Sequence, residues 1–140
     1  MPKSKSPLRL VIDSNLWVSF LISDKQRKLD RLLTIGKVRI VFSVELLDEL
    51  EKISKYPRLK KYFSSFAIEE MLVNLEPYID LVKVKSVISV CRDPKDNFLL
   101  SLAKDGKANF LLTRDKDLLI LQKVEKANID TITQFFEKIK

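Results

Sequence analysis

The strongest constraint on the fold is the regular alternation of short apolar runs with segments that carry apolar residues at helical spacing. Five runs of four or five residues predict buried strands, and helical segments separate them. Strands that alternate with helices in this way are typical of folds in which helices cover both faces of a mainly parallel sheet. We therefore predict a three-layer α/β/α sandwich with a five-stranded, mainly parallel sheet. The expected strands are 8–12, 39–42, 81–84, 109–113 and 129–132.

Residues that start or end helices support the predicted helices between these strands. Ser43 is placed as an N-cap, and Asp93-Pro94 combines an N-cap with proline at the first helical position. Gly36 and Gly106 are expected to end two of the helices. The predicted helices are 16–22, 25–35, 44–55, 59–77, 94–103, 117–126 and 133–139.

The length and the chain termini indicate a simple organisation. A chain of 140 residues fits one domain, because single cores usually span about 50–200 residues. We expect residues 8–140 to form this domain, after a flexible tail of residues 1–7. The lone Cys91 fits a reducing compartment better than a secreted one. Because neither a signal peptide nor a membrane span is recognisable, we expect a cytoplasmic protein.

The composition limits the chemistry that the chain can perform. It contains no histidine, which excludes His-ligated zinc, Ser-His-Asp catalysis and the usual proton shuttle at neutral pH. Any reaction must therefore depend on carboxylates, Lys, Ser, Tyr or a hard metal ion. A net charge of +7, from 26 Lys and Arg against 19 Asp and Glu, favours a polyanionic partner. A solvated lysine surface would have the same composition.

Two acids follow predicted strands at the place where open parallel sheets bind ligands. Asp13 directly follows the first strand, and Asp115 follows the fourth after only Arg114. Both would stand on the same edge of the sheet if those two strands are adjacent. The strand order itself does not follow from the sequence.

Two further acids lie on the apolar faces of predicted helices. At about 100° per residue, Glu49 falls at the edge of an apolar stripe and Asp96 falls inside a buried arc. A buried carboxylate is costly unless it is paired or bound to a metal ion. Acids that converge on one edge repel one another unless a cation neutralises them, and ligation by oxygen alone favours Mg²⁺ or Mn²⁺.

Each acid also has a purely structural interpretation. Asp93 and Asp115 are placed as N-caps, and Asp96 as a first-turn acid that the helix dipole favours. Glu49 fits an ordinary position at the flank of its helix. Asp13 has no capping role unless Ser14 begins the next helix, so it is the hardest to explain structurally.

The same residues carry a resemblance to the PIN-domain family, close to a group of toxins from toxin–antitoxin pairs. The similarity extends over residues 8–139 and depends on four segments in the right order. They are Val11-Ile12-Asp13-Ser14-Asn15, residues 43–58 around Glu49, Arg92-Asp93-Pro94-Lys95-Asp96-Asn97, and residues 112–119.

The resemblance implies a metal-dependent ribonuclease that acts as the toxin of a toxin–antitoxin pair. One or two Mg²⁺ or Mn²⁺ ions would activate a water molecule and stabilise the phosphate. The implied metal ligands are Asp13, Glu49, Asp96 and Asp115. The implied supporting residues are Asn15 and Thr113, through hydrogen bonds, and Asp93 and Asp117, as outer ligands. RNA, an antitoxin protein and a second copy of the chain in a homodimer are the implied partners.

Arg114 departs from the family pattern, in which Gly or Asn is frequent at this position. Its charge would either pair with a site acid and compete with metal, or bind a phosphate. The alternative function is therefore a catalytically weak module of the same fold that binds RNA or a partner protein. The other candidates for RNA binding are Lys52, Lys55, Arg58, Lys60 and Lys61, beside Tyr56, Tyr62 and Phe63.

Two other classes of protein place an acid after the first strand. A hydrolase of the haloacid dehalogenase type needs a second Asp two residues later, where this chain has Asn15. A response-regulator receiver needs paired acids before its phosphorylated aspartate, and Val11-Ile12 provides none.

Overall fold

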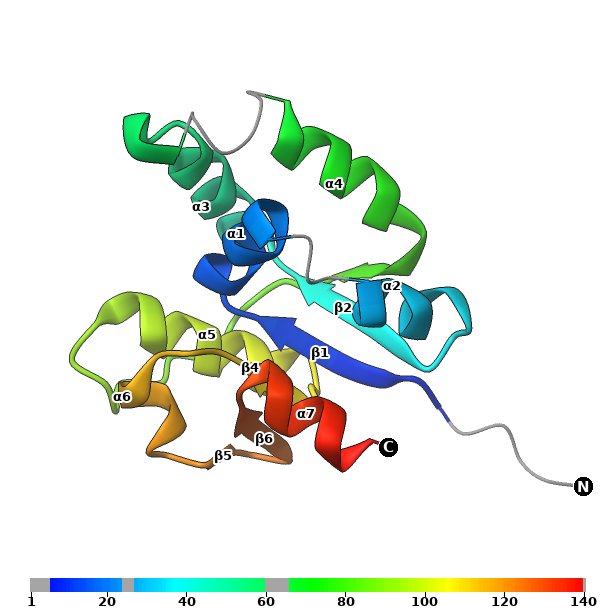
Figure 1. Ribbon diagram of the computed structural model, residues 1–140. Helices are drawn as coiled ribbons and strands as arrows, with labels where there is room; N and C mark the ends of the chain where they lie inside the picture. Colours follow the sequence, from blue (N-terminus) through cyan, green and yellow to red (C-terminus); the bar gives the residue numbers. More distant parts are fainter. Residues whose placement is uncertain (1–5, 24–26, 60–65, 140) are drawn as a thin grey trace, which may run out of the picture.

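The computed structural model describes residues 6–23, 27–59 and 66–139 of the chain. Its centre is a six-stranded sheet in the order β3-β2-β1-β4-β6-β5 (Figure 1). All neighbouring strands are parallel except β5 and β6, so the predicted mainly parallel α/β sheet is confirmed. The strands are β1 (Leu8–Ile12), β2 (Val38–Phe42), β3 (Ile79–Leu81), β4 (Phe110–Leu112), β5 (Lys123–Val124) and β6 (Ala127–Asp130).

Seven α-helices occur within the described residues, and two short 3₁₀ turns accompany them. The turns are η1 (Pro57–Leu59) and η2 (Glu76–Tyr78). The helices are α1 (Ser14–Ser23), α2 (Arg27–Thr34), α3 (Val44–Ser54), α4 (Ala67–Leu75), α5 (Pro94–Asp105), α6 (Lys116–Leu119) and α7 (Ile132–Lys138). No helix in these ranges is both long and apolar enough to cross a membrane.

The strand order explains how the helices come to lie on both faces of the sheet. From β1 the chain moves outward to β2 and β3, and then returns past β1 to β4. Because parallel crossovers are almost always right-handed, this reversal puts α1 to α4 on one face and α5 on the other. α5 packs on β1 and β4, whereas α7 covers β4 and β6 from the opposite side (Figure 1). The result is the three-layer arrangement that the alternation of strands and helices predicts.

The reversal of the strand order falls between β1 and β4. These strands are adjacent, with Ile12 opposite Leu112, and their following connections leave in different directions. Such a point, at the carboxyl ends of the strands, is where open α/β sheets bind ligands. Asp13 and residues 113–115 therefore come together at one edge of the sheet.

The largest error of the sequence analysis concerns residues 117–126, which were predicted as one helix. α6 ends at Leu119, and the chain then turns through Gln122 and Glu125, whose φ angles are 65° and 50°. These left-handed conformations interrupt a right-handed helix, and β5 instead pairs antiparallel with β6. The sheet therefore has six strands rather than the predicted five.

Other elements differ mainly in their bounds. The predicted helix 59–77 is replaced by η1, α4 and η2, and part of it lies outside the described residues, as do positions 25 and 26 of the predicted helix 25–35. β3 and β6 each begin two residues before their predicted starts. Most of the tail predicted for residues 1–7 also lies outside the described part of the chain.

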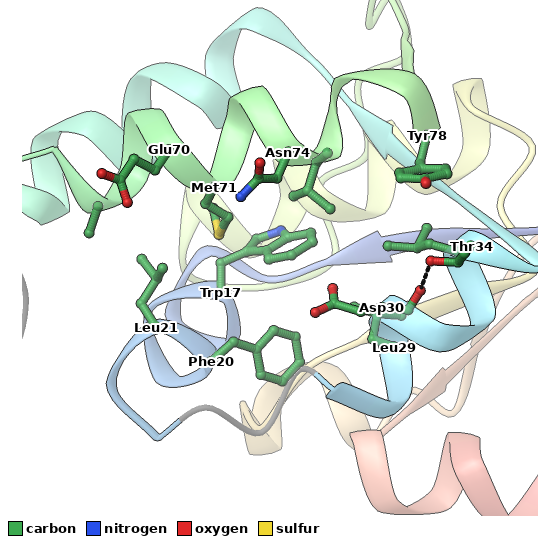
Figure 2. A pocket seen from close by; sticks show the side chains of 13 residues that line it. Trp17, Phe20, Leu21, Leu29, Asp30, Thr34, Glu70, Met71, Asn74 and Tyr78 are labelled. Carbon is green, nitrogen blue, oxygen red and sulfur yellow. Dashed lines mark hydrogen bonds between the residues drawn. The ribbon is translucent and has the colours of Figure 1, made fainter.

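Trp17 anchors the core on the face that α1 covers. It is 2% exposed, stacks on Phe42 with 5.5 Å between ring centroids, and meets Phe20 edge-on at 5.8 Å. A cavity of about 450 Å³ lies beside it between α1, α2 and α4, where Trp17 faces Met71 and Asn74 (Figure 2). α4 is therefore less tightly packed against the core than α5.

Candidate metal centre

Asp13 stands at the end of β1 and is almost fully buried, at 7% exposure. Its Oδ2 accepts a hydrogen bond of 2.8 Å from the Thr113 hydroxyl, and its Oδ1 accepts one of 3.2 Å from the backbone N–H of Asn15. Burial raises the pKa of Asp13, with smaller contributions from the charges of Glu49 and Asp115, while the two hydrogen bonds oppose the rise. The carboxylate is thus held in place but is poorly solvated.

Glu49 reaches the same region from α3. Ser43 begins this helix by accepting a hydrogen bond from the Leu46 backbone N–H, as predicted for an N-cap. The Glu49 Oε2 atom accepts a hydrogen bond of 3.1 Å from Ser14, and its Oε1 atom lies 3.2 Å from the Lys95 ammonium. Ser14 also lies 3.5 Å from Asp13, so it stands between the two carboxylates.

Asp96 comes from the first turn of α5. Asp93 caps this helix by accepting a hydrogen bond from the Lys95 backbone N–H, and Pro94 occupies the first helical position. Asp96 is 5% exposed, and its Oδ2 atom has no hydrogen-bond partner within the described residues. Burial raises the pKa of Asp96 to about 7, and hydrogen bonding and charge from Asp115 add to the rise.

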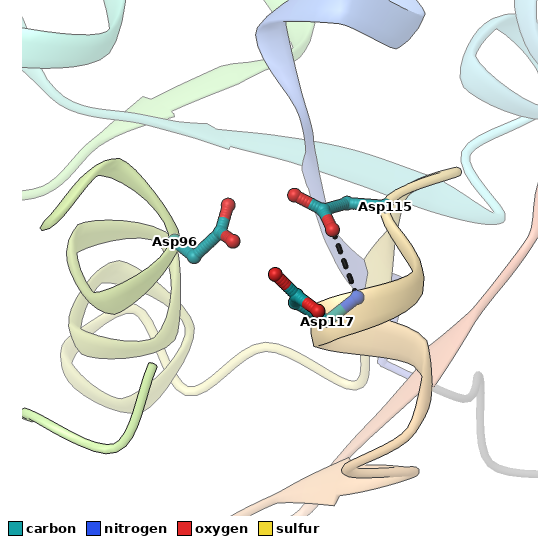
Figure 3. A group of neighbouring side chains, drawn as sticks. All are labelled: Asp96, Asp115 and Asp117. Atoms are coloured by element: carbon teal, nitrogen blue, oxygen red, sulfur yellow. Dashed lines mark hydrogen bonds between the residues drawn. The ribbon is translucent and has the colours of Figure 1, made fainter. Parts of the chain in front are cut away.

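Asp115 and Asp117 complete a group of three acids at the start of α6. Asp115 caps α6 by accepting a hydrogen bond of 2.9 Å from the Asp117 backbone N–H. Carboxylate oxygens of Asp96, Asp115 and Asp117 all lie within 4.8 Å of one another. Figure 3 shows the three carboxyl groups around a common space.

The chemistry of this group fits a hard divalent cation. All its donors are carboxylate oxygens, which Mg²⁺ and Mn²⁺ prefer, and nitrogen and sulfur ligands are not needed. The buried Asp96 Oδ2 atom, which has no partner in the described ranges, is costly unless a cation or a proton satisfies it. The residues present are therefore suited to Mg²⁺ or Mn²⁺.

The four acids predicted as metal ligands do not all lie in one group in the structure. Asp96 and Asp115 lie close together, and Asp117, expected as an outer ligand, is the third member of their group. Asp13 is connected to them through Thr113, whose hydroxyl also accepts a hydrogen bond from the Asp115 backbone N–H. Glu49 is connected to Asp13 through the Ser14 hydroxyl, which lies near both carboxylates.

The predicted supporting and basic residues occupy the margins of the site. Asn15 contacts Asp13 through its backbone N–H, and Asp93 caps α5. Arg114 is exposed in a hollow with Asp13, Asn15 and Asp115, and no ion pair within the described ranges joins it to a site acid.

The basic residues near Glu49 lie along α3 and η1. Lys52 lines a hollow beside Glu49, and Lys55 is exposed at the end of α3. Arg58 lies 5.7 Å from the centre of the Tyr56 ring. Lys60, Lys61, Tyr62 and Phe63 fall outside the described residues.

Two residues that contact the acids were not singled out from the sequence. Ser14 and Lys95 both lie inside the quoted motifs, directly after Asp13 and directly before Asp96. Their proximity to an acid along the chain was visible. Their common partner, Glu49, is 35 and 46 positions away in sequence, and only the fold brings it to them.

Comparison with solved structures supports the fold at low sequence identity. The crystal structure of PAE2754 from Pyrobaculum aerophilum matches with a TM-score of 0.59 and 17% identity, over 94% of this chain and 89% of that one. The PIN domain of human SMG5 matches with a TM-score of 0.52 and 15% identity, over 94% of this chain and 99% of that one. No curated protein sequence matches significantly.

The family assignment comes from the sequence itself. The model of the PIN domain matches residues 9–117, which include β1, α3, α5 and the start of α6. All the acids described above fall within this range. The PIN domain is a nuclease-type fold, and the described residues contain a group of three acids. The chain therefore belongs to the PIN domain family.

Proposed function

We propose that this protein is a ribonuclease that hydrolyses RNA phosphodiester bonds with Mg²⁺ or Mn²⁺. The observation that carries the proposal is the group formed by Asp96, Asp115 and Asp117, in which the buried Asp96 Oδ2 atom has no hydrogen-bond partner among the residues that the structure describes. When bound, the ion would supply a nucleophilic water and neutralise charge on the phosphate. This chemistry needs no histidine, in agreement with the composition.

The roles of the side chains follow from their positions. Asp96, Asp115 and Asp117 would hold the ion, while Asp13 and Glu49 would add negative charge beside it. The Thr113 hydroxyl positions Asp13 by donating a hydrogen bond to it. The same hydroxyl accepts a hydrogen bond from the Asp115 backbone N–H. These hydrogen bonds fix the Asp13 carboxylate and the Asp115 backbone before any ion binds, which reduces the reorganisation that binding requires.

Positive charge at the margins of the site supports an RNA substrate. Arg114 is exposed beside Asp13 and Asp115, and Lys52 lies beside Glu49. A phosphate that approaches a carboxylate-rich centre is repelled unless cations surround it. Arg114 and Lys52 would attract the phosphate. Lys55 and Arg58 would extend this basic surface along the bound RNA.

The resemblance to toxins further supports a cytoplasmic role in a toxin–antitoxin pair, in which the protein forms a homodimer and binds an antitoxin. Expression of the parent chain would then arrest growth, whereas Asp96→Asn would not. Sequencing of RNA ends after expression would identify the sites that are cut. Normal growth and unchanged RNA ends with the parent chain would contradict the toxin role.

Cleavage of an end-labelled RNA by the purified protein tests the nuclease function directly. We expect cleavage with Mg²⁺ or Mn²⁺ and none with EDTA. Asp13→Asn and Asp96→Asn should reduce the rate by at least a hundredfold while the fold is retained. Asp48→Asn is the matched control, because it removes an exposed carboxylate from the same helix as Glu49. Equal cleavage by the parent and Asp96→Asn would refute the assignment.

A further inference from the structure

Among the acids of the site, Glu49 is the one that forms an ion pair with a side chain within the described ranges. Oε1 lies 3.2 Å from the Lys95 ammonium, and Oε2 accepts a hydrogen bond of 3.1 Å from Ser14. Asp96 has the opposite character, since its buried Oδ2 atom has no partner among the residues described. Glu49 is therefore paired with an ammonium, whereas Asp96 keeps a buried oxygen without a partner in the described part of the chain.

We propose that Lys95 stands in for a second divalent cation, so that the site holds one ion among Asp96, Asp115 and Asp117 while Glu49 stays bound to the ammonium. The inference rests on the proposed function, because it assumes that Asp96, Asp115 and Asp117 bind a metal ion. The inference adds to the proposed function the number of metal ions that bind, and it names Lys95 as the residue that limits this number. Lys95 acts here as a positioning residue for Glu49.

The start of α5 explains how one helical turn supplies both groups. Asp93 and Pro94 fix the first turn, so the directions of Lys95 and Asp96 are set together. Successive residues of a helix point about 100° apart. Lys95 therefore meets Glu49 on α3, while Asp96 meets the acids at the start of α6.

Charge explains why the ammonium and a second ion exclude each other. Glu49 and Asp13 are the carboxylates that would remain to hold a second ion, and the Ser14 hydroxyl lies 3.1 Å from Glu49 and 3.5 Å from Asp13. The Lys95 ammonium already neutralises Glu49, and a divalent ion bound beside it would be repelled by the like charge. Removal of the ammonium leaves Glu49 and Asp13 without a cation, which favours binding of a metal ion there.

The inference can be tested by titrating the RNA-free protein with Mn²⁺. Calorimetry and electron paramagnetic resonance measure how many ions bind. Lys95→Met keeps most of the side-chain length and removes the charge, whereas Lys95→Arg keeps a cation. Lys116→Met is the matched control, because it removes an exposed lysine that lies between Asp115 and Asp117 in sequence. We expect one ion for the parent, Lys95→Arg and Lys116→Met.

Lys95→Met should bind two ions, with the second at least tenfold tighter than any second ion in the parent. Glu49→Gln in the Lys95→Met background should then return the stoichiometry to one. Two ions in the parent, or one ion in Lys95→Met, would overturn the inference and leave the nuclease function intact. A parent that binds no Mn²⁺ would overturn both.

Discussion

The Thr113 hydroxyl donates a hydrogen bond of 2.8 Å to Asp13 Oδ2, across the neighbouring strand ends of β1 and β4. The same hydroxyl oxygen accepts a hydrogen bond of 3.0 Å from the Asp115 backbone N–H. Thr113 is completely buried, so water cannot replace either interaction. One side chain therefore sets the spacing between two of the acids, and the parallel register of the strands determines where it stands.

Thr113→Val should weaken both the fold and the binding of metal. Valine has nearly the same shape but leaves Asp13 and the Asp115 N–H without their partner, which costs about 1–3 kcal/mol. We expect the free energy of unfolding to fall by this amount in urea titrations and the Mn²⁺ affinity to fall at least tenfold. Thr113→Ser should restore both. Thr34→Val, which removes an exposed helical hydroxyl, should have little effect.

Asp96 should make the metal-free protein less stable as the pH rises. Burial raises its pKa to about 7, whereas an aspartate in an unfolded chain titrates near ~3.9. Between these values the folded state binds the proton more strongly, so the free energy of unfolding decreases from about pH 4 to about pH 7 and then levels off. Urea titrations in EDTA should show a smaller decrease for Asp96→Asn. An identical pH dependence in parent and variant would contradict this assignment.

Asp80 should have the opposite dependence on pH. Its hydrogen bonds to Arg39, and less to Arg9, lower its pKa despite its partial burial. The stabilisation is therefore present above the pKa of an unfolded aspartate and is lost as the pH falls through the lower folded value. Asp80→Asn should reduce the free energy of unfolding by about 1–3 kcal/mol at pH 7, and by less in acid. Equal losses at pH 7 and pH 3 would argue against this role.

Two glycines offer a matched pair of substitutions that probe how α5 is seated. A Cβ at Gly106 would lie 2.6 Å from Val41 Cγ1 and 2.9 Å from the Leu102 carbonyl oxygen, so Gly106→Ala must push the end of α5 away from β2. We expect a loss of about 1–3 kcal/mol in thermal or urea unfolding. Gly36 has a φ of 79° and open space around it, so Gly36→Ala should cost only about 1 kcal/mol of backbone strain. A smaller loss at Gly106 than at Gly36 would contradict this view.

The sequence predicted those parts of the fold whose signals are local. The apolar run of β1, the Ser43 cap of α3 and the Asp93-Pro94 start of α5 all appear where they were expected. The prediction of a helix over residues 117–126 is wrong because their charges and apolar spacing also suit a helix. What decides their structure is the pairing of Lys123 and Val124 with β6, together with two left-handed residues, and neither has a clear local signal.

The candidate site likewise has features that the local sequence predicts and features that depend on contacts between distant residues. Helical phase alone indicated that Asp96 is buried, and the position after β1 singled out Asp13. The adjacency of β1 and β4, which brings Asp115 near Asp13, depends on the strand order. The ion pair of Lys95 with Glu49 could not be predicted, because an exposed lysine next to an acid is common and its partner comes from another helix.

The two strands that end the sheet are both very short. β3 has three residues and β5 has two, and β5 is folded back on β6 as an antiparallel hairpin. Each border therefore presents too few free N–H and C=O groups for a foreign strand to add in register. Even at high concentration, the folded protein should resist the edge-to-edge stacking that begins fibril growth.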